Sequence, residues 1–253
     1  MFSKLFGFKK KERADAVINT HPYAFLGIDM HAHLLPGIDD GAQTVEDSLA
    51  LIRSLMAMGY SHFITTPHIK SDIYPNTTET IQNALKEVQQ ALSAQEIEVP
   101  IRAAAEYYID DRFFELLETE KLLTLYKNEV LVEFSFVFEP VRLNETIFRI
   151  QTKGYNPVFA HPERYPFYHQ KPEVFREMKD RGCLLQLNLL SLSGYYGKSV
   201  KETAEWILQQ GLYDYCGTDL HHEKHVEGMQ KFAASKSFSL LKGYSFLNGR
   251  LGK

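Results

Sequence analysis

Short apolar runs alternate with longer amphipathic stretches after residue 27, and this alternation restricts the fold more than any other feature. The short runs are rich in β-branched and aromatic residues, which is typical of buried strands, whereas the longer stretches have helical periodicity. Repeated strand–helix units imply parallel strands that are joined by crossover helices. We expect seven strands: Ile28–Met30, His62–Thr66, Ile101–Ala105, Val130–Phe134, Pro157–Ala160, Cys183–Asn188 and Tyr213–Gly217.

The helices expected between these strands have recognisable ends. The first begins near Thr44, where Thr44 and Asp47 form a candidate capping box, and it ends at Gly59. The other expected helices cover about 77–94, 140–153, 171–182 and 199–210. A glycine follows each of the last three, at the position where glycine commonly terminates a helix.

Seven strand–helix units in one chain of 253 residues predict a closed or nearly closed α/β barrel. An open doubly wound sheet is the competing fold. No G-x-G-x-x-G motif follows the first strand and no Walker A motif is present, so a nucleotide-binding fold lacks support. We expect one barrel domain over 27–253 that follows a basic N-terminal extension over 1–26.

Charge and cysteine content exclude several classes of partner and site. The chain has 28 basic and 32 acidic residues spread along its length, so no basic stripe points to nucleic acid. Cys183 and Cys216 are too few for a disulfide framework, and we therefore expect a reducing, cytoplasmic compartment. Met1–Arg13 is too short for a membrane span; it predicts weak contact with an anionic membrane surface or a frayed terminus.

Side chains that bind metals stand at the ends of six of the seven expected strands. The first strand leads into His31 and His33, whose side chains face the same way because they are two residues apart. The last strand leads into a second pair of this kind, Asp219 and His221. The intervening strands end at single residues: His68, Glu106, Glu133 and His161.

The carboxyl ends of barrel strands form one face, so these scattered residues are expected to converge. A structural barrel has no reason to gather so many groups whose burial is costly. With Asp40 added, five neutral histidines and four carboxylates carry a charge of −4, which three divalent ions change to +2, favouring an anionic substrate. Imidazole and carboxylate ligands suit zinc, manganese or iron, and the absence of thiolates argues against a structural zinc site.

The stretches around these ligands also carry a family resemblance. They are residues 29–41, 66–68, 105–108, 132–135, 160–165 and 218–221. In these stretches the sequence resembles the polymerase and histidinol phosphatase (PHP) superfamily. Within it, the chain is similar to the bacterial manganese-dependent protein-tyrosine phosphatases of capsule and exopolysaccharide loci, the CpsB/CapC type.

The resemblance implies a distorted (βα)7 barrel that holds three divalent ions, with manganese expected first and iron or zinc as alternatives. It implies that Arg164 binds phosphate and that Arg164, Asp40 and His68 take part in catalysis. It also implies three ligand sets, in which Glu106 is shared: His31, His33, Glu106 and Asp219; Asp40, His68 and His221; and Glu106, Glu133 and His161.

The implied reaction is hydrolysis of phosphotyrosine in a protein, and the implied partner is a bacterial tyrosine autokinase of capsular or exopolysaccharide synthesis. Two alternatives stay open: a PHP phosphatase that acts on a small phosphate ester, and a non-catalytic regulator of polysaccharide assembly. A cysteine-based phosphatase is excluded because it needs an arginine six residues after the cysteine. Leu189 and His222 occupy those positions.

Further expectations concern residues next to the ligands. His169, His222 and His225 are candidates for a general acid, and none of them is preferred. Asp29 is expected to orient a histidine, or else to make a strand-end hydrogen bond. Five tyrosines near strand ends are candidates for an aromatic rim around a phosphotyrosine ring: Tyr107, Tyr108, Tyr165, Tyr195 and Tyr196.

Overall fold

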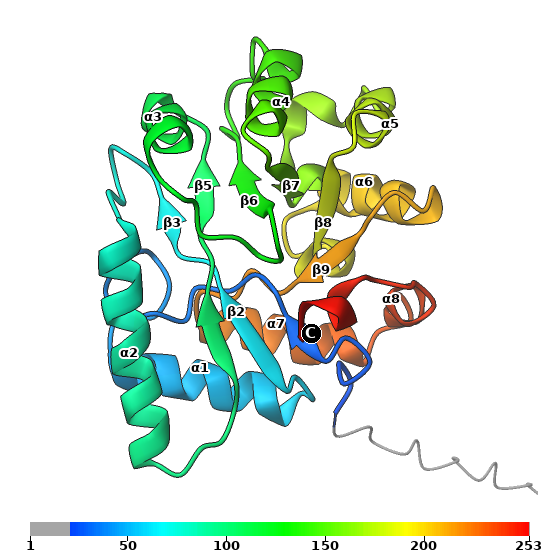
Figure 1. The fold of residues 1–253 in the computed structure, drawn as a ribbon. Helices are drawn as coiled ribbons and strands as arrows, with labels where there is room; N and C mark the ends of the chain where they lie inside the picture. The colour runs from blue at the N-terminus through cyan, green and yellow to red at the C-terminus, as the bar shows by residue number, and fades with distance from the viewer. Residues whose placement is uncertain (1–20, 253) are drawn as a thin grey trace, which may run out of the picture.

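The structure, a computed structural model, describes residues 21–252, and every strand in this part pairs in parallel with its neighbours within two sheets. The smaller sheet has the order β1 (Ile28–Asp29), β2 (His62–Thr65) and β4 (Ile101–Ala103). The larger sheet has the order β3 (His68–Ile69), β5 (Glu106–Tyr108), β6 (Glu129–Glu133), β7 (Asn156–Ala160), β8 (Leu184–Asn188) and β9 (Tyr215–Gly217). The larger sheet forms a curved wall with helices on its outer side (Figure 1).

Two of the seven predicted strands are shorter than expected, and each is followed by a short strand that belongs to the other sheet. The predicted strand His62–Thr66 ends at Thr65, and the chain enters the other sheet at His68 after Pro67, which has no amide N–H to continue a ladder. The predicted strand Ile101–Ala105 likewise stops at Ala103 before β5 begins. The prediction of a parallel α/β fold is therefore confirmed as a curled half-barrel, whereas a closed seven-stranded barrel is not confirmed.

Backbone contacts beyond the strands bring the first and last strand ends together. Ala32 and Leu220 form an isolated parallel bridge, and the amide of His33 donates to the carbonyl of Leu220 at 2.9 Å. The amide of Thr66 donates to the carbonyl of Ala32 at 2.8 Å. The segments that follow β1, β2 and β9 therefore lie side by side, which brings the predicted ligand segments to one place.

The helices expected from the sequence are present with small shifts of their ends. The capping box at the start of the first helix is confirmed, because Thr44 Oγ1 accepts from the Asp47 amide and Asp47 Oδ2 accepts from the Thr44 amide. The helices are α1 (Val45–Ala57), α2 (Thr78–Ala94), α3 (Asp111–Thr119), α4 (Leu143–Thr152), α5 (Glu173–Asp180), α6 (Lys198–Gln209), α7 (Glu223–Ala233) and α8 (Phe238–Lys242). Of these, α3, α7 and α8 were not expected from the sequence.

Residues 21–26, which the sequence analysis assigned to the N-terminal extension, pack on the domain. The Tyr23 ring is buried and lies 5.9 Å from the Tyr60 ring, and its hydroxyl donates to the carbonyl of Met229 at 2.7 Å. The single domain over 27–253 stays a prediction, and the predicted membrane contact of Met1–Arg13 lies outside the described residues. Between residues 21 and 252, no helix combines the length and the apolar character that crossing a membrane requires.

Candidate metal centre

The structure brings all nine predicted metal ligands into one cluster. Most of them lie at or just after the carboxyl ends of β1, β6, β7 and β9, whereas His68 and Glu106 begin β3 and β5, directly after the breaks that follow β2 and β4. They form three overlapping groups, and within each group the ligand atoms lie within 4.8 Å of one another. The groups are His33, Asp40, His68 and His221; His31, Glu106, His161 and Asp219; and His68, Glu106 and Glu133. Three side chains are grouped differently from the implied sets: His33 joins Asp40, His161 joins His31, and His68 also joins Glu133.

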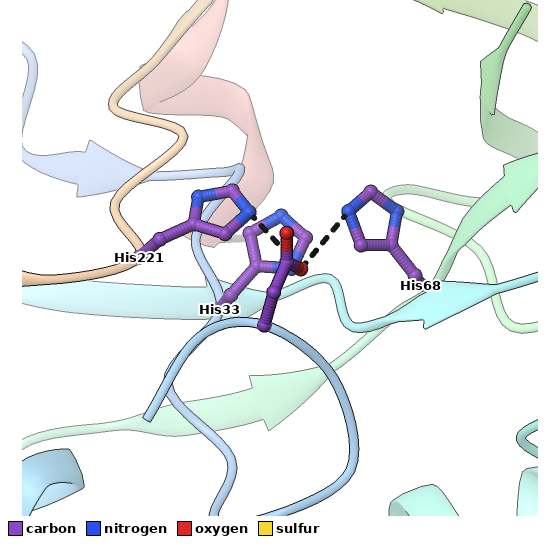
Figure 2. Close-up of side chains that lie close together, drawn as sticks. His33, His68 and His221 are labelled. Atoms are coloured by element: carbon purple, nitrogen blue, oxygen red, sulfur yellow. Dashed lines mark ion pairs between the residues drawn. The ribbon is translucent and has the colours of Figure 1, made fainter. Parts of the chain in front are cut away.

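The outermost group has Asp40 as its exposed member. His33, His68 and His221 turn toward one another in Figure 2, and the His33 and His221 rings lie 3.9 Å apart. Oδ1 of Asp40 lies 3.5 Å from Nε2 of His68 and 3.5 Å from Nε2 of His221. Asp40 is in the loop between β1 and α1, and 52% of its side chain is exposed, so it closes the cluster on the solvent side.

Glu106 lies at the centre of the cluster and is fully buried. Its Oε2 atom lies 3.2 Å from Nε2 of His31 and 3.2 Å from Nδ1 of His68, while Oε1 lies 3.1 Å from Nε2 of His161. Because its two oxygens face different histidines, Glu106 belongs to two of the three groups. This is the position that a bridging carboxylate needs.

Two buried side chains that the sequence analysis missed hold ligand histidines in place. Oε1 of Gln186 lies 2.8 Å from Nδ1 of His31, and Oδ2 of Asp39 lies 2.8 Å from Nδ1 of His33. Each contact directs Nε2 of the histidine into the cluster, as partners of metal-bound histidines usually do. The signals were a polar residue inside an apolar strand for Gln186 and the acidic pair Asp39-Asp40 in the first motif.

Asp29 does not orient a histidine ring, and the alternative expectation holds. Its Oδ1 accepts from the Thr218 amide at 3.0 Å, and its Oδ2 accepts from the Thr218 hydroxyl at 2.6 Å. Asp29 therefore joins the end of β1 to the segment that carries Asp219. Gly217 in that segment is needed for close approach, because a Cβ atom there would lie 2.5 Å from Cβ of His31.

The backbone is strained at two of the ligands. His161 has φ 36° and Asp219 has φ 51°, in the left-handed region that residues other than glycine rarely adopt. Such conformations persist where the surroundings enforce them, and they concentrate at functional sites. At His161 and Asp219 the backbone therefore leaves the extended conformation of the preceding strand, and both side chains are part of the cluster.

The electrostatics of the cluster fit divalent cations. Burial raises the pKa of Glu133 well above its ordinary value, and the neighbouring carboxylates of Glu106 and Asp219 raise it further. Burial also opposes ionisation of Asp219, but the imidazoles of His31 and His221 outweigh burial and lower the pKa of Asp219. Nδ1 of His161 is buried and makes no hydrogen bond within the described residues. The donors are nitrogen and carboxylate oxygen, which suits manganese, iron or zinc.

Arg164 lies beside the cluster on the short helical turn Pro162–Arg164. Its Nη1 atom donates to Oδ2 of Asp219 at 2.7 Å. Its guanidinium packs between two aromatic faces, 4.8 Å from the ring centre of Phe136 and 4.2 Å from that of Tyr196. The expected phosphate-binding arginine is thus held next to the ligands by an ion pair and two cation–π contacts.

A cavity of about 250 Å³ opens over the cluster. Besides ligands and Arg164, it is lined by four residues that the sequence analysis did not single out: Lys70, Ile73, Tyr74 and Phe136. The Tyr74 ring lies parallel to the His68 ring at 5.6 Å, and the Phe136 ring lies over the His161 ring at 5.6 Å. Two aromatic residues therefore flank the opening.

The predicted aromatic rim of five tyrosines is wrong, because none of them lines this cavity. Tyr107 and Tyr165 are buried in the core, where the Tyr107 hydroxyl accepts from the Leu123 amide. Tyr108 and Tyr196 contact residues that line the cavity, since each ring lies 4.2 Å from a cation, Lys70 or Arg164. Strand-end position alone did not reveal which rings face the opening.

None of the three candidate general acids lines the cavity. His169 lies at a different pocket, and its Nε2 is 2.9 Å from the carbonyl of Glu163. His225 is buried, with Nδ1 3.2 Å from the carbonyl of Asp219, and burial lowers its pKa to about 4. His222 is exposed beside the His225 ring. These histidines support or flank the ligand segment instead of facing the substrate space.

Together, the fold and the site define a class: a parallel α/β protein with three overlapping groups of candidate metal ligands in one cluster, beside an arginine that is paired with one of them. The family model for capsular polysaccharide synthesis, CpsB/CapC, matches residues 27–235. The chain belongs to the CpsB/CapC family, as the sequence resemblance indicated.

Two curated relatives illustrate the similarity. The tyrosine-protein phosphatase YwqE of Bacillus subtilis (strain 168) is 29% identical over 198 residues, which is 78% of each chain. The tyrosine-protein phosphatase CpsB of Streptococcus pneumoniae is 27% identical over 201 residues, covering 77% of this chain and 83% of that one.

A solved structure extends the similarity to the fold. It comes from work on YwqE from Bacillus subtilis and CpsB from Streptococcus pneumoniae, described there as unique metal-dependent tyrosine phosphatases. It superposes with a TM-score of 0.74 at 26% identity and covers 87% of this chain and 96% of that chain.

Proposed function

We propose that this protein is a metal-dependent protein-tyrosine phosphatase of capsular or exopolysaccharide synthesis. The observation that carries the proposal is the convergence of nine candidate ligands in one cluster that lies beside Arg164 and under a cavity, in a family whose curated relatives are named tyrosine-protein phosphatases. The substrate would be a phosphotyrosine protein, with a bacterial tyrosine autokinase as partner. We place it in the cytoplasm, and its two buried free thiols agree with a reducing compartment.

Three divalent ions would be held by the three groups of ligands, with Glu106 and His68 shared. Manganese is proposed first, and iron or zinc can use the same donors. The sequence around these groups resembles the PHP superfamily, and we propose that the two sheets form the wall of its distorted (βα)7 barrel. The bridge between Ala32 and Leu220 supports this, because it joins the ends of the first and last strands.

Bound ions would act as Lewis acids and supply a water nucleophile at neutral pH. The guanidinium of Arg164 has donors besides the Nη1 that Asp219 uses, and these can hold the phosphoryl oxygens. Asp40 and His68 line the cavity and would hold an ion on the side of the cluster that faces the opening. The tyrosine leaving group has a pKa of about 10, so it needs less protonation than an alkyl alcohol.

The test is a side-by-side assay of phosphotyrosine peptide, phosphoserine peptide and small alkyl phosphate esters with manganese, iron and zinc. We expect metal-dependent hydrolysis of the phosphotyrosine peptide, lost on chelation and in His31→Ala and Asp219→Ala. An intact phosphotyrosine peptide alongside turnover of a small ester would favour the small-molecule alternative. Fewer than one ion per folded, unchelated chain would contradict the metal site itself.

A further inference from the structure

One wall of the cavity is a tight turn over residues 70–74. Lys70 and Tyr74 exchange two backbone hydrogen bonds of 2.9 Å, which places both side chains at the cavity. The hydroxyl and the amide of Ser71 donate to Oδ2 of Asp110 at 2.8 and 3.1 Å. Nδ2 of Asn76 donates to the carbonyl of His68 at 2.9 Å. The turn is thus tied down on both sides and presents a fixed surface.

The register of the strands sets the height of Lys70 above the metal ligands. β3 pairs with β5 so that His68 is opposite Glu106 and Ile69 is opposite Tyr107. Two residues along a strand advance about 6.6 Å and face the same side. Lys70 therefore follows His68, one level nearer the opening. The ammonium of Lys70 lies 4.2 Å from the ring centre of Tyr108. Tyr108 is two residues beyond Glu106 on β5, just as Lys70 is two residues beyond His68.

The two cations of the cavity differ in their partners. Arg164 is paired with Asp219 at 2.7 Å. Within residues 21–252, no carboxylate forms an ion pair with Lys70, whose ammonium rests on the Tyr108 ring. A lysine ammonium on a flexible stem can leave a ring face for a carboxylate in a partly desolvated position. Lys70 therefore offers an uncommitted positive charge at the opening.

We propose that Lys70 selects phosphotyrosine sites that carry an acidic side chain beside the phosphotyrosine. The proposal rests on the phosphatase function above, and it names the class of peptide which that site prefers. The phosphate group would bind next to the candidate ligands and Arg164. The residues that flank the phosphotyrosine would then lie nearer the opening, beside Lys70. Apart from the candidate ligands and Arg164, Lys70 is the only charged residue that lines the cavity among residues 21–252, so a charge preference for flanking residues comes from it.

The experiment uses the full chain loaded with manganese and three phosphotyrosine peptides that differ only in one residue next to the phosphotyrosine: Glu, Gln or Lys. The readout is the ratio of kcat/KM between the Glu and Lys peptides, a measure that loss of folded protein does not change. The variants are Lys70→Met and Lys70→Glu. The matched control is Lys242→Met, because Lys242 also packs on a ring, that of Phe238, but does not line the cavity.

The wild-type protein should prefer the Glu peptide about twofold to fivefold, the range expected for one partly exposed charge pair. Lys70→Met should abolish the preference, Lys70→Glu should invert it, and Lys242→Met should keep it. A wild type without preference, or a preference that survives in Lys70→Met, overturns the proposal. A uniform loss on all three peptides would mean a phosphate contact and also overturns it. A wild type inactive on every phosphotyrosine peptide contradicts the phosphatase function instead.

Discussion

Nη1 of Arg164 donates to Oδ2 of Asp219 at 2.7 Å, so the residue expected to bind phosphate is bonded to a metal-ligand candidate. Nδ2 of Asn188 donates to the same oxygen at 2.8 Å. Because both contacts are made by Oδ2, the other oxygen of Asp219, Oδ1, faces the imidazoles and lies 3.3 Å from Nε2 of His31. The arginine is therefore fixed relative to the cluster before substrate arrives.

Replacing Arg164 with Lys or Met should lower kcat/KM for a phosphotyrosine peptide by about 100-fold to 1,000-fold, the cost of losing a preorganised donor. Lysine should restore little, because it lacks the planar fork that matches phosphate. Metal affinity should change less, since Asn188 still holds Asp219. Steady-state kinetics and metal titration separate these effects, and a near-normal rate in Arg164→Met would disprove the assigned role.

Asp39→Asn should weaken metal binding while the fold is retained. Oδ2 of Asp39 contacts Nδ1 of His33 at 2.8 Å and accepts from the His68 amide at 3.1 Å, so one carboxylate positions two ligand residues. Loss of such an outer partner typically reduces metal affinity about 10-fold to 100-fold. Manganese titration of Asp39→Asn against Asp180→Asn, an exposed site on α5, measures this. Equal affinities in both variants would show that Asp39 does not support the site.

The sequence allowed the candidate ligands that cluster in the structure to be predicted, because a residue type and a strand end are both local features. His31, Glu106 and Asp219 each follow an apolar run, and the parallel topology brings these run ends together. The strand predicted from the sequence ended at Thr66, just before Pro67, but the sequence did not predict that His68 begins a strand of another sheet, because only the pairing of strands assigns it there.

The rest of the site depends on three-dimensional arrangement. Gln186 belongs to the site because β8 places it against His31, and nothing near it in the sequence names that partner. Lys70 and Phe136 resemble ordinary surface residues until a turn and a loop bring them to the cavity. Tyr107 and Tyr165 show the opposite case, since residues near strand ends turned into the core.

Both thiols should be unreactive in the native protein. Burial raises the pKa of Cys183 from 9.0 to about 12, although the charges of Lys179 and Arg181 partly offset this effect. Burial also raises the pKa of Cys216 well above its ordinary value. Thiolate is the reactive form. The neutral buried thiols thus contribute stability that is fully present below pH 9 and is lost as the pH rises through 12.

Mass spectrometry after iodoacetamide treatment at pH 8.5 should find both cysteines unmodified in native protein and modified after denaturation. Phosphatase activity should survive the native treatment, and a Cys183→Ser, Cys216→Ser double variant should stay active, because no arginine lies six residues after either cysteine. A loss of activity that parallels the extent of cysteine labelling would instead support a cysteine-based mechanism.

The aromatic side chains of Tyr74 and Phe136 should make the site prefer aryl phosphate substrates over alkyl phosphates. Tyr74 and Phe136 flank the opening, and a phosphotyrosine ring between them gains ring contacts that an alkyl ester cannot make. Tyr74→Ala and Phe136→Ala should each lower kcat/KM for phosphotyrosine by about threefold to tenfold and change that for an alkyl phosphate less. Phe148→Ala is the control, since Phe148 is exposed on α4 and does not line the cavity. Equal losses on aryl and alkyl esters would mean that these rings shape the cavity without recognising the leaving group, which would remove the structural reason for preferring phosphotyrosine over a small ester.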